Sequence, residues 1–377
     1  MSISTVTNSI LIGLWMGLLA LPFMGWQDAG KIAAALTIGG VLWRALTTWG
    51  RSGPADTAMT LFRRRARALG HAFVWVNRPV LFAGLGALFL ILPLFLNNYY
   101  IDILSLAGLY ALLAAGLNIT VGSAGLLDLG YAGFYGIGAY VYGLLSTGIG
   151  LSFWLGLPLG GLIAASFGVI LGMITLRLRG DYLAIVTLGF VQIIYLVFNN
   201  WDSVTNGPNG ILNIGRPELP GFPLRQPIHF YYLILALLLL TVVAIYRLSR
   251  SQIGRAWIAI REDELAASAM GINTTQMKIL AFALGAGIAG VAGVFFAAKY
   301  TFISPESFTF LESVRVLSMV VLGGMGSLPG AILGAFLLTV LPEILRELAN
   351  YRMLIFGAAL VVMMIFRPQG LLGRRSQ

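Results

Sequence analysis

The stretch MKILAFALGAGIAGVAGVFFAA, Met277–Ala298, decides the fold class. Its 22 residues carry a single charge, on Lys278, and are otherwise apolar or small. About 20 such residues in a helix cross a hydrocarbon core of about 30 Å. A helix also satisfies every backbone amide within itself, as lipid requires, whereas barrel strands would alternate in polarity. The stretch therefore predicts a transmembrane helix.

The whole chain repeats this pattern. It has 377 residues, of which 58% are hydrophobic and 10% charged, whereas soluble domains are about 45–50% apolar and about 25% charged. We expect an all-α, polytopic transmembrane helix bundle with about ten to twelve spans, some short or broken. The candidate spans are 9–26, 32–48, 80–96, 101–118, 130–148, 152–175, 182–200, 230–247, 277–298, 311–323, 329–345 and 352–366. The 311–323 span is short and holds Glu312 and Arg315 near its start.

The distribution of basic residues predicts the orientation. With a cytoplasmic N-terminus, sixteen of the 24 Lys and Arg fall in inner segments and six in outer ones, while Arg44 and Arg315 lie within or beside spans. Inner loops of membrane proteins collect Lys and Arg. The same rule accounts for the formal net charge of +10, so we expect no nucleic-acid partner. The segment 248–276 is predicted to be cytoplasmic and the loop 201–229 external.

Two regions are expected. Residues 1–79 are predicted to form a two-span hairpin followed by a basic cytoplasmic linker, in which Arg63, Arg64, Arg65 and Arg67 suit the anionic inner leaflet. The N-terminus lacks a basic n-region and an A-x-A site, which favours a retained first span. Residues 80–377 are predicted to form the main bundle.

Enzymatic motifs are absent or incomplete. The chain has no cysteine and only two histidines, His71 and His229, so we expect no metal and no cofactor. The stretch GWQDAGKI, Gly25–Ile32, approaches a P-loop but lacks its final Ser or Thr. The stretch GAGIAG, Gly285–Gly290, lacks the strand–turn–helix setting of a dinucleotide site and indicates a helix face for close packing. We expect a transport protein without its own ATPase site, and not an enzyme.

Two glycine-rich stretches interrupt the apolar blocks, at Gly116–Tyr140 and Val321–Ala335. Paired broken helices in transporters often flank the substrate site, although tight turns and close packing are the alternative. Asp128 lies inside the first stretch, and it could contact a substrate amine, cap a helix or lie at the cytoplasmic edge. The candidate residues of the substrate pathway are Asn118, Asp128, Tyr131 and Tyr135.

The cytoplasmic segment REDELAASAMGINTTQMK, Arg261–Lys278, is highly charged at its start and rich in small residues thereafter. On a helix, Ala267, Ser268 and Gly271 share the face of Glu264. A flat face of this kind allows another protein to approach closely, and a solvated loop is the alternative interpretation.

This segment also carries a resemblance to a known family. ELAASAMG, Glu264–Gly271, resembles the coupling-helix signature of ABC importer permeases, an E-A-A followed three residues later by G, with Leu265 inserted here. The full loop RSQIGRAWIAIREDELAASAMGIN is similar to that of the branched-chain amino-acid permeases. GLLDLGYAGFYGIGAY, LRGDYLAIVTLGF, TNGPNGI, SPESFTFLESV, MVVLGGMGSLPGAILGA and YRMLIFGAALVVMMIFRPQGLL resemble the LivM-type branch of that family, and together the resemblance covers about residues 80–373.

The resemblance implies a permease subunit of an ATP-driven importer in the bacterial inner membrane. Its expected partners are a homologous permease subunit, two cytoplasmic ATP-binding subunits, a periplasmic substrate-binding protein and the lipid bilayer. Glu264, Ala266, Ala267 and Gly271 are the residues expected to couple to an ATP-binding subunit. The alternatives are a urea-type permease of the same class and an ion-coupled secondary transporter, for which Asp128 and Asp102 would be the intramembrane carboxylates.

Overall fold

The computed structural model describes residues 90, 92–176, 178, 180–219, 222–223, 226–344 and 370–372. The chain divides into two units, Met1–Phe89 and Leu90–Gln377, and all described residues belong to the second. The expected hairpin and linker, the P-loop-like stretch, the span 352–366 and most of the span 80–96 therefore lie outside the described residues.

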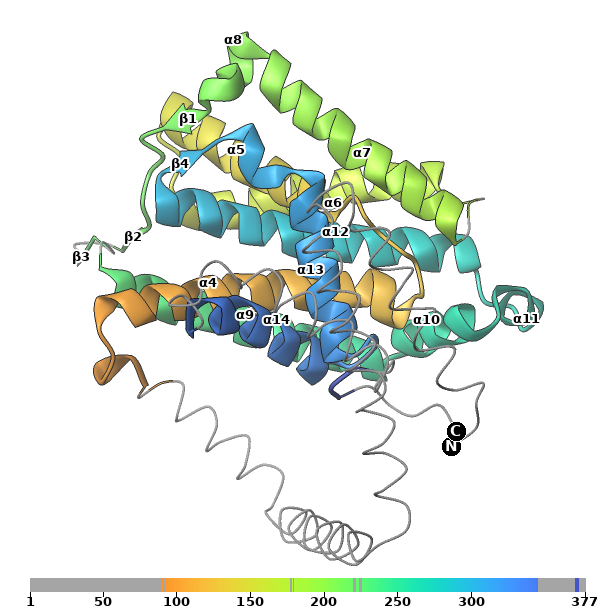
Figure 1. Cartoon of the computed structure of the whole chain (residues 1–377). Helices are drawn as coiled ribbons and strands as arrows, with labels where there is room; N and C mark the ends of the chain where they lie inside the picture. Colours follow the sequence, from red (N-terminus) through yellow and green to blue (C-terminus); the bar gives the residue numbers. More distant parts are fainter. Residues whose placement is uncertain are drawn as a thin grey trace, which may run out of the picture. The chain divides into compact units, whose positions relative to one another are not determined.

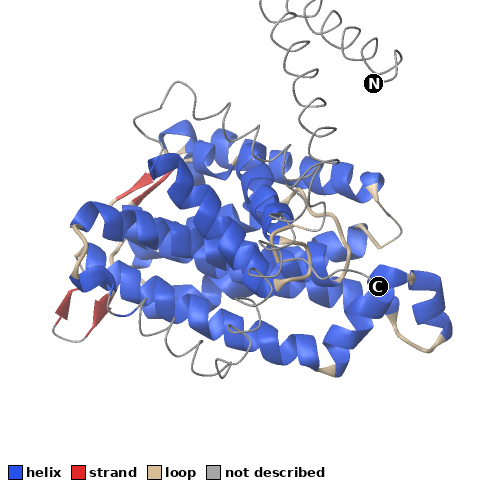
Figure 2. Cartoon of the chain, turned by 60° about the horizontal axis from the view of Figure 1, so that its bottom comes forward, coloured by secondary structure: helices blue, strands red, loops and turns tan. Residues whose placement is uncertain are grey.

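The described chain is overwhelmingly helical (Figures 1 and 2). Its helices are η1 (Leu92–Leu94), α4 (Asn98–Leu117), η2 (Asn118–Ser123), α5 (Tyr131–Ile149), α6 (Phe153–Ile174), α7 (Asp181–Asn200), α8 (Asp202–Thr205), η3 (Gly207–Asn209), α9 (Pro227–Arg250), α10 (Gln252–Glu262), α11 (Glu264–Ala269), α12 (Thr274–Tyr300), η4 (Pro305–Phe308), α13 (Phe310–Gly323) and α14 (Leu328–Ile344). The all-α, polytopic bundle expected from the sequence is confirmed.

Four short strands form two antiparallel pairs within the described residues. β1 (Ile211–Leu212) pairs with β4 (Phe302–Ile303), with Ile211 opposite Ile303. β2 (Glu218–Leu219) pairs with β3 (Phe222–Pro223). The first pair joins the expected external loop to the chain that follows α12, and it lies at the opposite end of the bundle from α11 (Figure 1).

Five described segments are long and apolar enough to cross a membrane. They are Asn98–Ser123, Phe153–Ile174, Asp181–Asn200, Pro227–Arg250 and Thr274–Tyr300. Each overlaps a span expected from the sequence, with ends shifted by a few residues. The short predicted span 311–323 corresponds to α13, which has 14 residues, and at about 1.5 Å per residue this helix is only about 21 Å long.

The core lies where α12 packs against α5 and α6. A Cβ on Gly138 of α5 would collide with the backbone of Gly290 in α12, and a Cβ on Gly290 would lie 2.5 Å from the carbonyl oxygen of Gly160 in α6. Small residues let helix backbones approach in this way, and dispersion between closely packed atoms then holds them. The packing face predicted for Gly285–Gly290 is confirmed. We call Gly138, Gly160 and Gly290 the glycine contact.

On the other side of α12, α4 packs against α9 and α14. Figure 1 shows α13 running across the direction of α4 and α12. Lys299 at the end of α12 pairs with Asp102 at the start of α4 at 2.9 Å, so the two helices run antiparallel. We call the end of the bundle that carries α10 and α11 the inner end, because the basic residues of this loop predict that it is cytoplasmic.

Candidate functional site

The two glycine-rich stretches meet at the inner end. α4 gives way to the π-helical segment η2, and the turn between α13 and α14 includes Gly324 and Gly326, both with positive φ. The Asn118 side-chain oxygen accepts a hydrogen bond from the backbone N–H of Gly326 at 2.9 Å. Both predicted helix interruptions are therefore confirmed. π-helical turns are rare and often occur at functional sites.

Arg261, in the last turn of α10, joins the cytoplasmic loop to this junction. Its Nη1 donates to the carbonyl oxygen of Gly122 in η2 at 2.7 Å. A Cβ on Gly326 would lie 2.9 Å from the same Nη1, so the guanidinium also lies against the turn between α13 and α14. We call Asn118, Gly122, Arg261 and Gly326 the inner cluster. Arg261 was not predicted as a site residue from the sequence, although its place at the head of four consecutive charged residues was a signal.

The remaining candidate pathway residues are buried around the start of α5. Asp128 is 1% exposed; its Oδ1 accepts from the Gly130 N–H at 2.8 Å, and its Oδ2 has no hydrogen-bond partner among the described residues. The Tyr131 hydroxyl donates to the Gly285 carbonyl of α12 at 3.2 Å. Tyr135 packs edge-on against Phe308, with 5.0 Å between ring centroids.

These four side chains are at most 3% exposed. Asn118 belongs to the inner cluster, whereas Asp128, Tyr131 and Tyr135 lie along the first turns of α5 and the loop before it. Asn118, Tyr131 and Tyr135 hold neighbouring segments together in this conformation, whereas Asp128 bonds within its own loop. Their contact with a substrate stays a prediction.

Helix α11 is well defined at both ends. The Asp263 carboxylate caps its start by accepting from the N–H groups of Leu265 at 2.9 Å and Ala266 at 3.0 Å. Gly271, with φ of +83°, follows its end, where a residue with positive φ satisfies the last carbonyl groups. The coupling-helix prediction therefore falls on a helix of six residues, Glu264–Ala269.

The predicted coupling residues do not all point the same way. Glu264 pairs with Lys278 of α12 at 2.5 Å, and Ala267 is 3% exposed, so both face the bundle. Ala266 and Gly271 are exposed. The face turned away from the bundle carries Leu265 and Met270, which are 68% and 83% exposed. Sequence reasoning missed these two residues, although large apolar side chains in a charged loop were a signal.

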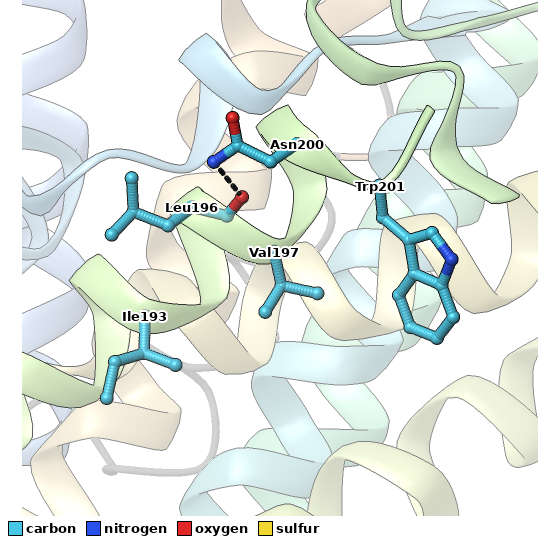
Figure 3. Close-up of a pocket in the computed structure, with 5 residues that line it drawn as sticks. All are labelled: Ile193, Leu196, Val197, Asn200 and Trp201. Atoms are coloured by element: carbon cyan, nitrogen blue, oxygen red, sulfur yellow. Dashed lines mark hydrogen bonds between the residues drawn. The ribbon is translucent and has the colours of Figure 1, made fainter. Parts of the chain in front are cut away.

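A pocket on α7 has a different character (Figure 3). It has a volume of about 440 Å³ and is lined by Ile193, Leu196, Val197, Asn200 and Trp201. Its amide, on Asn200, donates to the Leu196 carbonyl of its own helix at 2.9 Å. No charged group converges on this pocket, and its exposed apolar side chains suit contact with lipid or protein.

The sequence of this chain matches a known protein family. A family described as "Branched-chain amino acid transport system / permease component" matches residues 99–364. That range contains the two glycine-rich stretches and the capped cytoplasmic helix.

The chain belongs to this permease family.

Relatives support the membership. The permease is 46% identical to the high-affinity branched-chain amino acid transport system permease protein LivM of Salmonella typhimurium, over 74% of this chain and 71% of the relative. It is 30% identical to the protein LivH of the same organism, which carries the same description, over 72% and 93%. It is 28% identical to BraD of Pseudomonas aeruginosa, over 72% and 94%. No solved structure matches the chain.

These findings confirm three expectations drawn from the sequence. The permease is a membrane transport component of the LivM type, its family serves branched-chain amino-acid transport, and its place is the inner membrane. One organism has two related permeases of this description, LivM and LivH, so a second permease is a general feature of such a system.

Proposed function

We propose that this permease translocates branched-chain amino acids as one of two homologous permease subunits. Two cytoplasmic ATP-binding subunits supply the energy, and a periplasmic binding protein delivers the cargo. The permease hydrolyses no ATP itself. The 46% identity to LivM supports the cargo class, and the names of LivM and LivH support the pairing of two permeases.

The observation that carries the proposal is the exposed apolar surface of α11. Leu265 and Met270 project from an otherwise polar loop. Their burial against a partner would remove apolar surface from water and so stabilise the complex. We place the groove of an ATP-binding subunit over Leu265, Ala266, Met270 and Gly271. Glu264 and Ala267 face the bundle instead. Glu264 holds α11 there through its ion pair with Lys278, and Ala267 is buried beside it.

The inner cluster supplies a route from this contact to the membrane. A displacement of α11 moves α10, and Arg261 carries the movement to η2 and to the turn before α14. The buried pathway residues Asn118, Asp128, Tyr131 and Tyr135 would become accessible when these segments separate. The permease domain in this proposal spans 80–377, with the coupling loop at 248–276, and 1–79 is a separate hairpin with its basic linker.

Substitution of Gly271 tests the docking role. Gly271→Arg places a long cation in the proposed interface, while Gly271→Ala imposes the same positive φ on a side chain without that bulk. A Cβ at this position meets no atom within 4 Å, so both variants should insert and fold. We expect Gly271→Arg to lower leucine uptake at least about tenfold and to release the ATP-binding subunit, and Gly271→Ala to retain both. Normal uptake by Gly271→Arg would refute the docking surface.

The energy source and cargo are tested on cells that express the complete system. We expect uptake of leucine, isoleucine and valine to stop on ATP depletion and to survive collapse of the ion gradients. Uptake that follows an ion gradient instead would indicate a secondary transporter. Uptake of urea in place of these amino acids would correct the cargo class while leaving the ATP-driven mechanism intact.

A further inference from the structure

A second group of polar side chains lies far from the inner cluster, on α4 and α13. The Tyr110 hydroxyl accepts a hydrogen bond from Arg315 Nη1 at 2.9 Å. The same Nη1 lies 3.5 Å from Glu312 Oε2, and the guanidinium is 5.5 Å from the centre of the Tyr110 ring. We call these three residues the mid-span triad.

The triad lies near the middle of the membrane. Tyr110 is 12 residues from the start and 13 from the end of the span Asn98–Ser123, which places it roughly 18–20 Å from each end of that helix. The chain returns from the outer end of α12 through β4 and η4, and Phe308 is fully buried before α13 begins. Ser313 Oγ accepts from the Ala132 N–H in the first turn of α5 at 2.8 Å, so α13 begins inside the bundle.

The exposure of Arg315 at this depth is the decisive observation. Its side chain is 56% exposed, whereas that of Glu312 is 17% exposed. Among the described residues, its Nε and Nη2 have no hydrogen-bond partner. A charged group at mid-depth is too costly to face lipid, and such groups face water, a pathway or another protein. The exposed face of α13 therefore does not contact hydrocarbon.

The arrangement matches the two charges of an amino acid. The free edge of a guanidinium accepts a carboxylate through two parallel N–H···O bonds. Glu312, three residues earlier on the same helix, offers a carboxylate for an ammonium group. Leu311 is 73% exposed and lies one turn from Arg315, so an apolar contact stands beside the charged pair.

We infer that Tyr110, Glu312 and Arg315 form a mid-membrane site that holds the carboxylate and ammonium groups of the translocated amino acid. Arg315 binds the carboxylate and Glu312 the ammonium group, while Tyr110 holds the Arg315 side chain in place from α4. The cargo's side chain contacts Leu311. This inference rests on the proposed function, because it takes a free amino acid as the cargo.

The test measures uptake of radiolabelled leucine by proteoliposomes that contain the complete importer, together with ATP hydrolysis stimulated by the binding protein. We expect Arg315→Met to lower uptake at least about tenfold, since a charge-assisted bidentate contact is lost. Stimulated ATP hydrolysis and co-purification of the second permease should persist. Arg315→Lys should recover part of the uptake, because it keeps the charge without the planar fork.

Two further variants serve as controls for Arg315→Met. Ser318→Met, one turn along α13 from Arg315, replaces a hydroxyl that bonds to the Val314 carbonyl of its own helix with an apolar side chain, and it should leave uptake unchanged. Tyr110→Phe keeps the ring, removes the hydroxyl and should lower uptake a few-fold. If Arg315→Met fails to insert, Arg315→Lys and Tyr110→Phe decide in its place: reduced uptake with normal hydrolysis supports the site.

Two results would overturn the inference. The first is wild-type uptake by Arg315→Met, or by both Arg315→Lys and Tyr110→Phe. The second is loss of the second permease from Arg315→Met complexes with recovery in Arg315→Lys, which would make the triad a subunit contact. Neither result touches the proposed function, which fails instead if the wild-type importer takes up no leucine, isoleucine or valine.

Discussion

The glycine contact and the inner cluster join helices in opposite ways. In the glycine contact, the backbones of α5, α6 and α12 approach one another at glycines, beside the side chains of Ala164 and Val294. In the inner cluster, one long side chain, Arg261, bridges from α10 to η2 and the turn before α14. A backbone contact is lost as soon as the helices separate, whereas a guanidinium can follow a moving carbonyl by rotating its side chain.

This difference divides the described bundle by its capacity for movement. We expect α5, α6 and α12 to move as one body, since any relative shift would break close packing. The inner ends of α4, α13 and α14 meet at glycines with positive φ and at a π-helical segment, where the backbone is less regular. We expect transport motions to occur at the inner cluster while the glycine contact stays fixed.

The largest expected effect comes from breaking the glycine contact. Gly290→Leu forces side-chain atoms into the backbone of α6, where a Cβ alone would already lie 2.5 Å from the Gly160 carbonyl oxygen. We expect a destabilisation of about 3 kcal/mol or more, seen as loss of the protein from detergent-solubilised membranes.

Gly189→Leu is the matched control for this substitution. Gly189 lies within α7, and a Cβ there meets no atom within 4 Å. Replacement of a helical glycine by leucine should keep or slightly raise the stability, because glycine costs about 1 kcal/mol in a helix interior. Equal loss of both variants would show that the glycine contact carries no special packing.

An intermediate effect is expected from Arg261→Met. It removes the bond to the Gly122 carbonyl without placing any atom in a packed helix contact. We expect folding and ATP hydrolysis to persist while leucine uptake falls about tenfold, which corresponds to about 1.4 kcal/mol of lost coupling. The measurement is the number of leucine molecules imported per ATP hydrolysed.

Arg255→Met is the control. Arg255 lies in the same exposed loop, but its side chain donates to the carbonyl of Arg250, which is outside the inner cluster. Arg261→Lys should recover part of the uptake because an ammonium group can also donate to Gly122. A parallel fall of hydrolysis and uptake in Arg261→Met would argue for a folding role alone.

The smallest effect is expected from the ion pair that holds α11. Lys278→Met removes the ion pair with the Glu264 carboxylate, whose side chain is only 20% exposed. The cost should be roughly 1 kcal/mol, because a charge-assisted bond is lost while Glu264 keeps some access to water. The melting temperature of the purified complex measures it.

The double variant with Glu264→Gln and Lys278→Met should restore most of this loss, because both charges of the pair are then removed together. A double variant that is no more stable than Lys278→Met would mean that the ion pair does not position α11.

Sequence alone predicted the fold class and the broken helices, because continuous apolar blocks and glycine-rich interruptions are local patterns. It also predicted the close packing of Gly285–Gly290 from small-residue spacing. It did not predict that Asn118 would meet Gly326, since these residues are 208 positions apart. Such long-range contacts depend on how helices pack, which no local period encodes.

The coupling segment shows a second limit. Helical spacing grouped Glu264 with Ala267 and Gly271, yet the helix ends at Ala269. Glu264 and Ala267 face the bundle and are therefore not on the exposed face of α11. Which face of a short helix turns outward depends on partners such as Lys278, which lies on a different helix. Arg315 was visible in the sequence as a charge near a short span, but its exposure at mid-depth is a property of the folded chain.

Two carbonyl groups at the end of α13 accept hydrogen bonds from residues much later in the sequence. The N–H of Leu371 donates to the Leu322 carbonyl at 2.9 Å, and the N–H of Leu372 to the Gly323 carbonyl at 3.0 Å, each across 49 positions of the chain. Carbonyl groups at a helix end need partners. At a synthesis rate of about 5–20 residues per second, these two wait for roughly 2–10 s after they leave the ribosome. The inner end of this permease is thus finished only after a further 49 residues have been made.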